Sequence, residues 1–102
     1  MPAPELEPRT LCLLRRPANP PGLTQDELDA LQEQHVAYLT SLRRRGKTVM
    51  SGPFSDQPDE SWRGLVLYAT TLEKARALAD EDPAVVGGRL AADVFTWWTS
   101  RE

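Results

Sequence analysis

Four apolar segments and two amphipathic ones make up most of this chain, and the order in which they follow one another restricts the possible folds more than any other feature. The apolar segments are short and rich in leucine, valine and aromatic residues, which is typical of β-strands. We predict strands over residues 10–15, 47–54, 62–69 and 90–99. One amphipathic segment follows the first strand and the other follows the third, so the predicted order is β-α-β-β-α-β.

The first amphipathic segment has clear helix boundaries. Thr24 precedes Glu27 by three positions, which is the spacing of a capping box at a helix start. Gly46 follows a run of three arginines and supplies a C-terminal stop. We therefore predict a helix between Thr24 and Gly46.

The second amphipathic segment shows the same signals in a shorter form. Thr70 and Glu73 repeat the capping-box spacing. The dipeptide Asp82-Pro83 ends the predicted helix, because a proline disfavours helical geometry in the residue before it. Residues 85–88 are then expected to form a turn or a short extra helical piece.

The predicted order of elements is the split βαβ arrangement of ferredoxin-like folds. Right-handed crossovers place both helices on one face of a four-stranded antiparallel sheet. The expected fold class is α+β, with a single domain over residues 10–102. Residues 1–9 are predicted to form a flexible, proline-rich N-terminal tail.

The strands of this predicted sheet are apolar on both faces. Leu65 and Leu67 alternate with Val66 and Tyr68, whereas a strand with one solvated face shows polar alternation. The helices cover only one face of the sheet. We therefore predict a homodimer through the open sheet face, with a ligand or a different partner on that face as the alternative.

Charge and cysteine content exclude several classes of protein. Twelve basic and fifteen acidic side chains give a formal charge of -3, which argues against a nucleic-acid partner. No apolar run approaches the roughly 18 residues of a membrane span, and no secretory leader is visible, so we expect a cytoplasmic protein without a membrane partner. Cys12 is the single cysteine and is predicted to be a buried, inert thiol. No cluster of cysteines and histidines predicts a metal, and no cofactor is expected.

His35 is the only histidine in the chain. It lies seven positions after Leu28 and four after Leu31, so it belongs to the helix stripe that faces the sheet. One interpretation is a core histidine that is hydrogen-bonded to a backbone carbonyl. The other is a general acid or base, because imidazole titrates near neutral pH.

Asp82 is a candidate partner for this histidine. Its spacing from Ala75 and Ala79 places it on the inner face of the second helix, at the C-terminal end where a negative charge is unfavourable. A histidine on the neighbouring helix would compensate, since a carboxylate fixes the imidazole tautomer and raises its basicity. The alternative is an aspartate that only caps the following turn.

Three motifs in a fixed order resemble a known family, the YciI-like (YCII-related) proteins. They are Gln34-His35-Val36-Ala37-Tyr38-Leu39, Ser51-Gly52-Pro53-Phe54 and Ala79-Asp80-Glu81-Asp82-Pro83, and the similarity runs from about residue 10 to residue 99. The resemblance implies a dimeric ferredoxin-like domain related to the dimeric α/β-barrel enzymes. It also implies an active site centred on a histidine and an aspartate, which map onto His35 and Asp82. Characterised relatives point to lyase or isomerase chemistry on small cyclic compounds, including dehydrochlorination of chlorinated hydroxyquinols.

Polar and basic residues near the predicted strand ends are further candidates for the site. Ser51, Gly52 and Pro53 are candidate substrate-binding residues, although the same tripeptide can simply turn the chain. The arginines at predicted strand ends are candidates for binding a carboxylate substrate; they are Arg15, Arg16 and Arg89.

Three hypotheses about function follow. The first is a small cofactor-independent enzyme in which His35 moves a proton and Asp82 orients it, for elimination or isomerisation next to a carbonyl. The second is a non-catalytic small-molecule-binding or accessory dimer with the same pocket. The third is a structural dimer in which the two residues only hold the helices together.

Overall fold

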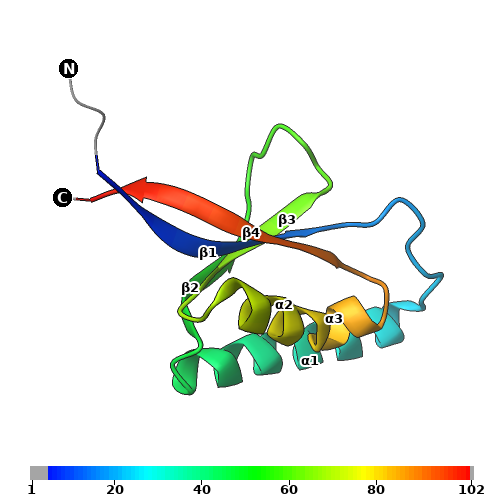
Figure 1. Cartoon of the computed structure of the whole chain (residues 1–102). Coiled ribbons are helices and arrows are strands. Elements are labelled where there is room, and N and C mark those ends of the chain that lie inside the picture. The colour runs from blue at the N-terminus through cyan, green and yellow to red at the C-terminus, as the bar shows by residue number, and fades with distance from the viewer. Residues whose placement is uncertain (1–4, 102) are drawn as a thin grey trace.

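The helices and strands follow the order that the sequence predicts. The computed structural model describes residues 5–101. The elements in chain order are β1 (Leu6–Arg15), α1 (Gln25–Arg44), β2 (Thr48–Pro53), β3 (Trp62–Tyr68), α2 (Leu72–Asp80), α3 (Pro83–Val86) and β4 (Ala91–Ser100). The sheet has the order β2-β3-β1-β4 with antiparallel neighbours, and the helices lie together on one face of it (Figure 1). This confirms the ferredoxin-like α+β fold.

β1 begins earlier than predicted. Residues 6–9 pair with Trp97–Ser100 of β4, so the expectation of a flexible tail is wrong for them, while residues 1–4 lie outside the described residues. In this stretch β1 has a neighbour on one side only, because its pairing with β3 starts at Thr10. Pro8 lies in this stretch. Proline has no backbone N–H to donate, so it is tolerated in a strand that is paired on one side only.

The helix caps are confirmed in one helix and shifted in the other. In α1, the Thr24 hydroxyl accepts from the Glu27 N–H at 3.2 Å and Glu27 Oε1 accepts from the Thr24 N–H at 3.1 Å, which is the predicted capping box. In α2 the cap is Thr71, whose hydroxyl accepts from the Lys74 N–H at 3.3 Å. The predicted capping box of Thr70 and Glu73 is therefore wrong, because the helix begins one residue later.

The core lies between the helices and the covered face, the sheet face that they pack on. The sheet contributes buried side chains at alternate positions, and α1 and α2 fill the space above them. These core residues are Cys12, Leu14, Val66, Tyr68, Leu42, Ala75 and Ala79. Burial, together with the nearby Asp82 carboxylate and more distant acids, raises the pKa of the Cys12 thiol to about 12, as expected for an inert core cysteine.

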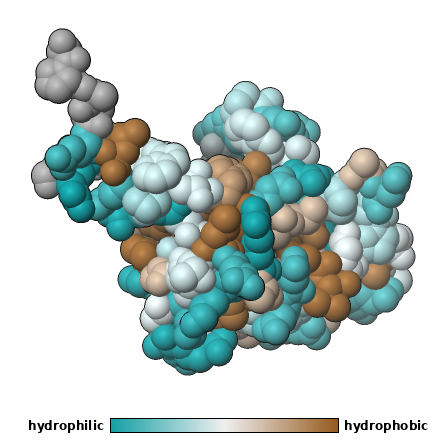
Figure 2. Space-filling view, viewed as in Figure 1, coloured by the Kyte–Doolittle hydropathy of each residue, from teal (hydrophilic) through white to brown (hydrophobic). Residues whose placement is uncertain are grey.

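The open face is the other side of the sheet, where no helix lies. Its apolar side chains are half-buried or exposed; they are Leu11, Leu13, Leu65, Leu67, Phe95 and Trp97. The loop of residues 54–61 stands above this face as a hydrophilic lobe, while apolar side chains reach the surface at the level of the sheet (Figure 2).

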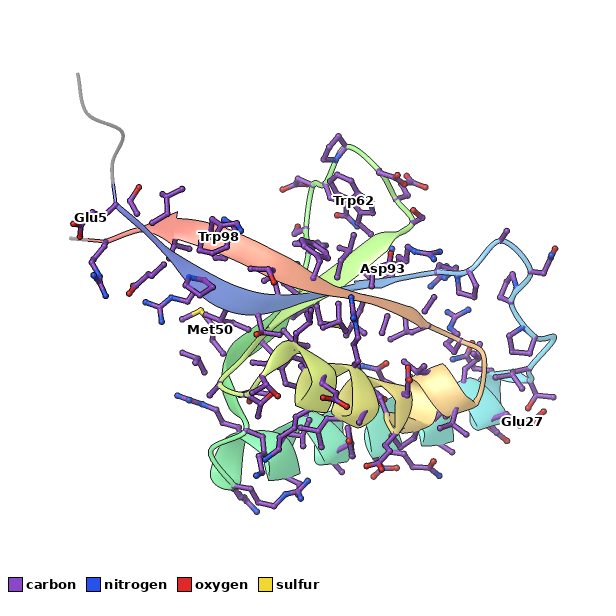
Figure 3. All side chains as sticks on the ribbon, viewed as in Figure 1. Glu5, Glu27, Met50, Trp62, Asp93 and Trp98 are labelled. Atoms are coloured by element: carbon purple, nitrogen blue, oxygen red, sulfur yellow. The ribbon has the colours of Figure 1, made fainter. Side chains whose placement is uncertain are left out.

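A hollow of about 440 Å³ lies between this loop and the open face. Its walls include Leu13, Leu65 and Phe95 from the sheet and Phe54 from the loop. Trp62, at the start of β3, also lines it and lies on the loop's side of the sheet, away from the helices (Figure 3). The open face therefore combines exposed apolar side chains with a shallow apolar recess.

Candidate functional site

His35 lies in the middle of α1 and points toward the inside of the domain. The residue is only 9% exposed, as its place on the apolar stripe of the helix predicts. Its Nδ1–H donates to both carboxylate oxygens of Asp82, at 2.7 Å to Oδ2 and 2.9 Å to Oδ1. Because a carboxylate can only accept, this contact favours the proton on Nδ1, and in the neutral imidazole the lone pair is then on Nε2.

Asp82 joins α2 to α3. It lies two residues after the end of α2 and is the N-cap of α3, where its Oδ1 also accepts from the Ala84 N–H at 2.9 Å. The sequence left open whether Asp82 contacts the histidine or caps the next turn, and in the structure the same carboxylate does both. The position at the start of α3 places the negative charge near backbone N–H groups, which offsets the unfavourable end of α2.

Contacts between α1 and α3 hold the two side chains at this distance. The helices pack side by side (Figure 1), and Gly87 at the end of α3 lies against Leu31 of α1. A Cβ at Gly87 would be 3.2 Å from Leu31 Cδ2, so the close approach favours glycine at this position. The backbone of α3 thus positions Asp82 directly opposite His35.

A groove of about 1070 Å³ runs between α1 and the edge of the sheet formed by β2. His35 lines this groove, whereas Asp82 does not and lies behind the imidazole. The two ring nitrogens are on opposite sides of the imidazole, so Nε2 is the nitrogen that a ligand in the groove can reach. The volume is sufficient for a small organic molecule.

The three predicted substrate-binding residues line the opposite wall of the groove. Ser51, Gly52 and Pro53 are exposed and form the end of β2. Ser51 pairs with Val66 of the covered face, so its side chain lies on the same side of the sheet as α1. The structure therefore brings all three residues to the groove that His35 lines.

Of the two glycines in this wall, the one required for close approach is Gly64. A Cβ at Gly64 would lie 2.7 Å from the carbonyl oxygen of Gly52, whereas a Cβ at Gly52 would have nothing within 4 Å. The close approach of the two strands therefore requires the glycine of β3, while β2 has open space beside its own.

The predicted strand-end arginines separate into two environments. Arg15 does not reach the groove, because its Nε donates to Asp93 Oδ2 at 2.6 Å. Arg16 and Arg89 do line the groove, and Arg63 joins them there. Sequence reasoning missed Arg63; the available signal was one charged residue near the start of an otherwise apolar strand.

Two kinds of feature are absent from residues 5–101, a metal site and a membrane-spanning helix. Across residues 5–101, no three of the histidine, cysteine, aspartate and glutamate side chains come together in a way that could hold a metal ion. In the same range, no helix is long and apolar enough to cross a membrane.

These features define a ferredoxin-like α+β domain with a buried histidine–aspartate pair, of which the histidine lines a groove. The sequence model of the YCII-related domain matches residues 10–97, which is most of the chain. The chain therefore belongs to the YCII-related family, as its three motifs predicted.

One solved structure with a similar fold is 5-chloro-2-hydroxyhydroquinone dehydrochlorinase (TftG) from Burkholderia phenoliruptrix AC1100, in complex with 2,5-dihydroxybenzoquinone. The two chains are 24% identical, the alignment covers 86% of this chain and 92% of the other, and the TM-score is 0.54. At this identity the similarity establishes the fold. No curated protein matches the sequence significantly.

Proposed function

We propose that this protein is a small cofactor-independent lyase or isomerase that moves a proton on a small cyclic or carbonyl compound. His35 is the acid–base group and Asp82 is its positioning residue. The observation that carries the proposal is the 2.7 Å contact between His35 Nδ1 and Asp82, on an imidazole that also lines a large groove. Membership of the YCII-related family and the fold shared with a dehydrochlorinase support this class of chemistry.

The pair is suited to act first as a base. Asp82 holds the Nδ1–H tautomer, so the Nε2 lone pair faces the groove and accepts a proton from a carbon next to a carbonyl. The carboxylate also stabilises the imidazolium that forms, as in other histidine–carboxylate pairs. Burial of both side chains keeps water from competing for these hydrogen bonds.

Two outcomes can follow from this first step. In an elimination, the electron pair of the broken C–H bond forms a carbon–carbon double bond, and a leaving group such as chloride departs with its own bonding pair. In an isomerisation, the Nε2–H of the imidazolium returns the proton to a different carbon of the same molecule. In this proposal the Ser51 hydroxyl donates to a substrate oxygen, and Gly52 and Pro53 form the wall behind it.

We also propose that the protein is a homodimer through the open face. The support is the set of exposed aromatic residues there, of which Phe95 is 43% exposed and Trp97 is 49% exposed. Large apolar side chains grouped on one face of a sheet are typical of an interface. The His35 groove lies beside α1, on the other side of the sheet. In a dimer formed through the open face, each subunit therefore keeps its own groove.

Hydrogen–deuterium exchange tests the proton transfer in both directions: the imidazolium delivers a deuteron to a ring carbon to give the keto tautomer, and Nε2 then removes the original proton from that carbon. The probe is 2,5-dihydroxybenzoquinone in D2O, and the measurement is loss of its ring C–H signal in proton NMR. We expect the wild-type protein to accelerate this exchange and His35→Gln to lower the rate at least about 100-fold. Gln34→Ala is the matched control, because Gln34 is an exposed neighbour on α1 that does not line the groove.

A second measurement tests the positioning role of Asp82. Nitrogen-15 NMR of the neutral imidazole should show the Nδ1–H tautomer in the wild type and a shift toward Nε2–H in Asp82→Asn, together with slower exchange. A wild-type protein that does not accelerate the exchange contradicts the proposal. If the quinone nevertheless shifts the His35 resonances, the non-catalytic binding alternative holds instead.

A further inference from the structure

Three arginines converge at one end of the groove. Arg16 directly follows β1, Arg63 is the second residue of β3, and Arg89 precedes β4 by two residues. These positions are neighbours because Arg15, the last residue of β1, pairs with Trp62 of β3 on one side and with Ala91 of β4 on the other. Figure 1 shows that β1 ends on the side of the sheet where β3 and β4 begin.

No carboxylate neutralises this cluster within the described chain. Among residues 5–101, none of the three guanidinium groups lies within salt-bridge distance of an aspartate or glutamate. Arg63 donates to the backbone carbonyl of Glu60 at 3.1 Å. The Nε of Arg16 is buried and is the one such side-chain atom in this range without a hydrogen-bond partner.

The charges of the cluster act on one another. Burial, followed by the charges of Arg89 and Arg63, lowers the pKa of Arg16 below its ordinary value. The groove as a whole is lined by five arginines and by one acidic residue, Asp29, whose carboxylate accepts from the Gln25 side chain. An excess of positive charge in one groove contrasts with the net charge of -3 for the chain.

The cluster is joined to the histidine–aspartate pair through one residue. The Ala84 N–H donates to Asp82 at 2.9 Å, and the Ala84 carbonyl accepts from the Arg89 N–H at 3.0 Å. The short helix α3 therefore fixes Arg89 relative to Asp82 and, through it, to His35. A ligand held by the arginines would extend from a fixed point toward the imidazole.

We infer that Arg16, Arg63 and Arg89 bind an oxyanionic group, a carboxylate, of a small organic ligand in the groove. A carboxylate accepts two parallel hydrogen bonds from one guanidinium group, and Arg16 has an unused donor for it. The inference deepens the proposed function by naming the class of substrate as a small organic acid, and in that respect it rests on the proposal for His35.

The test compares two probes of the same shape, benzoate and benzamide. We expect benzoate to shift the NMR signals of the groove residues and to bind at least about tenfold more tightly than benzamide. Arg16→Gln and Arg89→Gln should each weaken benzoate binding about tenfold or more. Arg45→Gln removes the same charge from an exposed position outside the groove and should change the affinity by less than about twofold.

Arg63→Gln keeps the test decisive if the variant of half-buried Arg16 or Arg89 fails to fold. Arg63 is exposed, so its replacement leaves the core intact and should still weaken benzoate binding. Three results would overturn the inference: no benzoate binding by the wild type, equal binding of benzamide, or an equal loss in Arg45→Gln. His35→Gln should retain benzoate binding. If the wild type binds benzoate as expected but does not accelerate the deuterium exchange, only the proposed catalysis is rejected and the carboxylate site stands.

Discussion

The two faces of the sheet depart from the usual separation of polar and apolar side chains in opposite ways. On the covered face the helices bury a titratable pair, with Asp82 2% exposed and His35 9% exposed. On the open face, Phe95 and Trp97 remain 43% and 49% exposed. Burying polar groups and exposing large apolar ones both cost free energy unless a partner is present.

The source of the compensating partner differs between the faces. On the covered face His35 and Asp82 satisfy each other, and the Ala84 N–H adds a further hydrogen bond to the carboxylate. On the open face, the elements of residues 5–101 supply only the loop over one part of the sheet. The covered face is therefore built as a site within one chain, whereas the open face is suited to contact with a second chain.

The largest expected effect concerns the open face. Phe95→Asp should raise the dissociation constant of the dimer at least about 100-fold, because it buries an unpaired carboxylate in the interface. Phe95 is exposed in the single chain, so the monomer should remain folded. Analytical ultracentrifugation is the measurement, with twice the 11.4 kDa chain mass expected for the wild type.

Val86→Asp is the matched control on the helical side of the domain. Val86 is 73% exposed on α3, and the same change from an apolar residue to aspartate should leave the dimer intact there. A wild-type protein that is monomeric at high concentration would contradict the contrast between the two faces. Equal dissociation of both variants would place the interface elsewhere.

Local signals explain why most of the fold could be predicted. The capping box at Thr24 and Glu27 and the stop at Gly46 depend only on neighbouring residues, and both are present in the structure. The start of β1 at Leu6 depends on pairing with β4, some 90 residues away in sequence. A proline-rich segment gives no local sign of such a partner.

The same difference between local signals and long-range pairing applies to the candidate site. Helical spacing placed both His35 and Asp82 on inner helix faces, and their side chains are in contact in the structure. The arginine cluster could not be derived in this way. Its convergence depends on the β1–β3 register, which shifts between Leu14 and Arg15, and a shift of this kind redirects the side chains that follow.

A smaller effect tests how tightly the covered face is packed. Gly64 pairs with Leu14 of that face, and Gly64→Ala would place a Cβ 2.7 Å from the Gly52 carbonyl oxygen. We expect it to lower the free energy of unfolding by about 2 kcal/mol, because backbone must shift to accommodate the methyl group. Urea denaturation measures the change.

Gly52→Ala is the control within the same pair of strands. Gly52 pairs with Leu65 of the open face, and its added methyl group would have nothing within 4 Å. Its free energy of unfolding should stay within about 0.5 kcal/mol of the wild type. Equal destabilisation by both variants would show that steric room does not distinguish the two positions.

The remaining effect, absent near neutral pH, is the pH dependence of stability that Cys12 contributes to the covered face. Burial is the main cause that raises the pKa of this thiol to about 12 in the folded protein, so the unfolded chain loses the thiol proton first as the pH rises. The unfolded state then binds fewer protons than the folded state, and the free energy of unfolding falls from the ordinary thiol range up to about pH 12. Near neutral pH the thiol is protonated in both states and contributes no slope.

The variant Cys12→Ala has no thiol to ionise at this position. Its free energy of unfolding, measured by urea denaturation over alkaline pH, should therefore fall less steeply than that of the wild type. The pKa of Tyr68 is also raised, first by burial and second by the Cys12 thiol, so most of the Tyr68 contribution is common to both proteins and the difference between the two slopes reports chiefly on Cys12. Identical slopes would mean that the covered face admits water to the thiol, which would contradict the closed packing that separates this face from the open one.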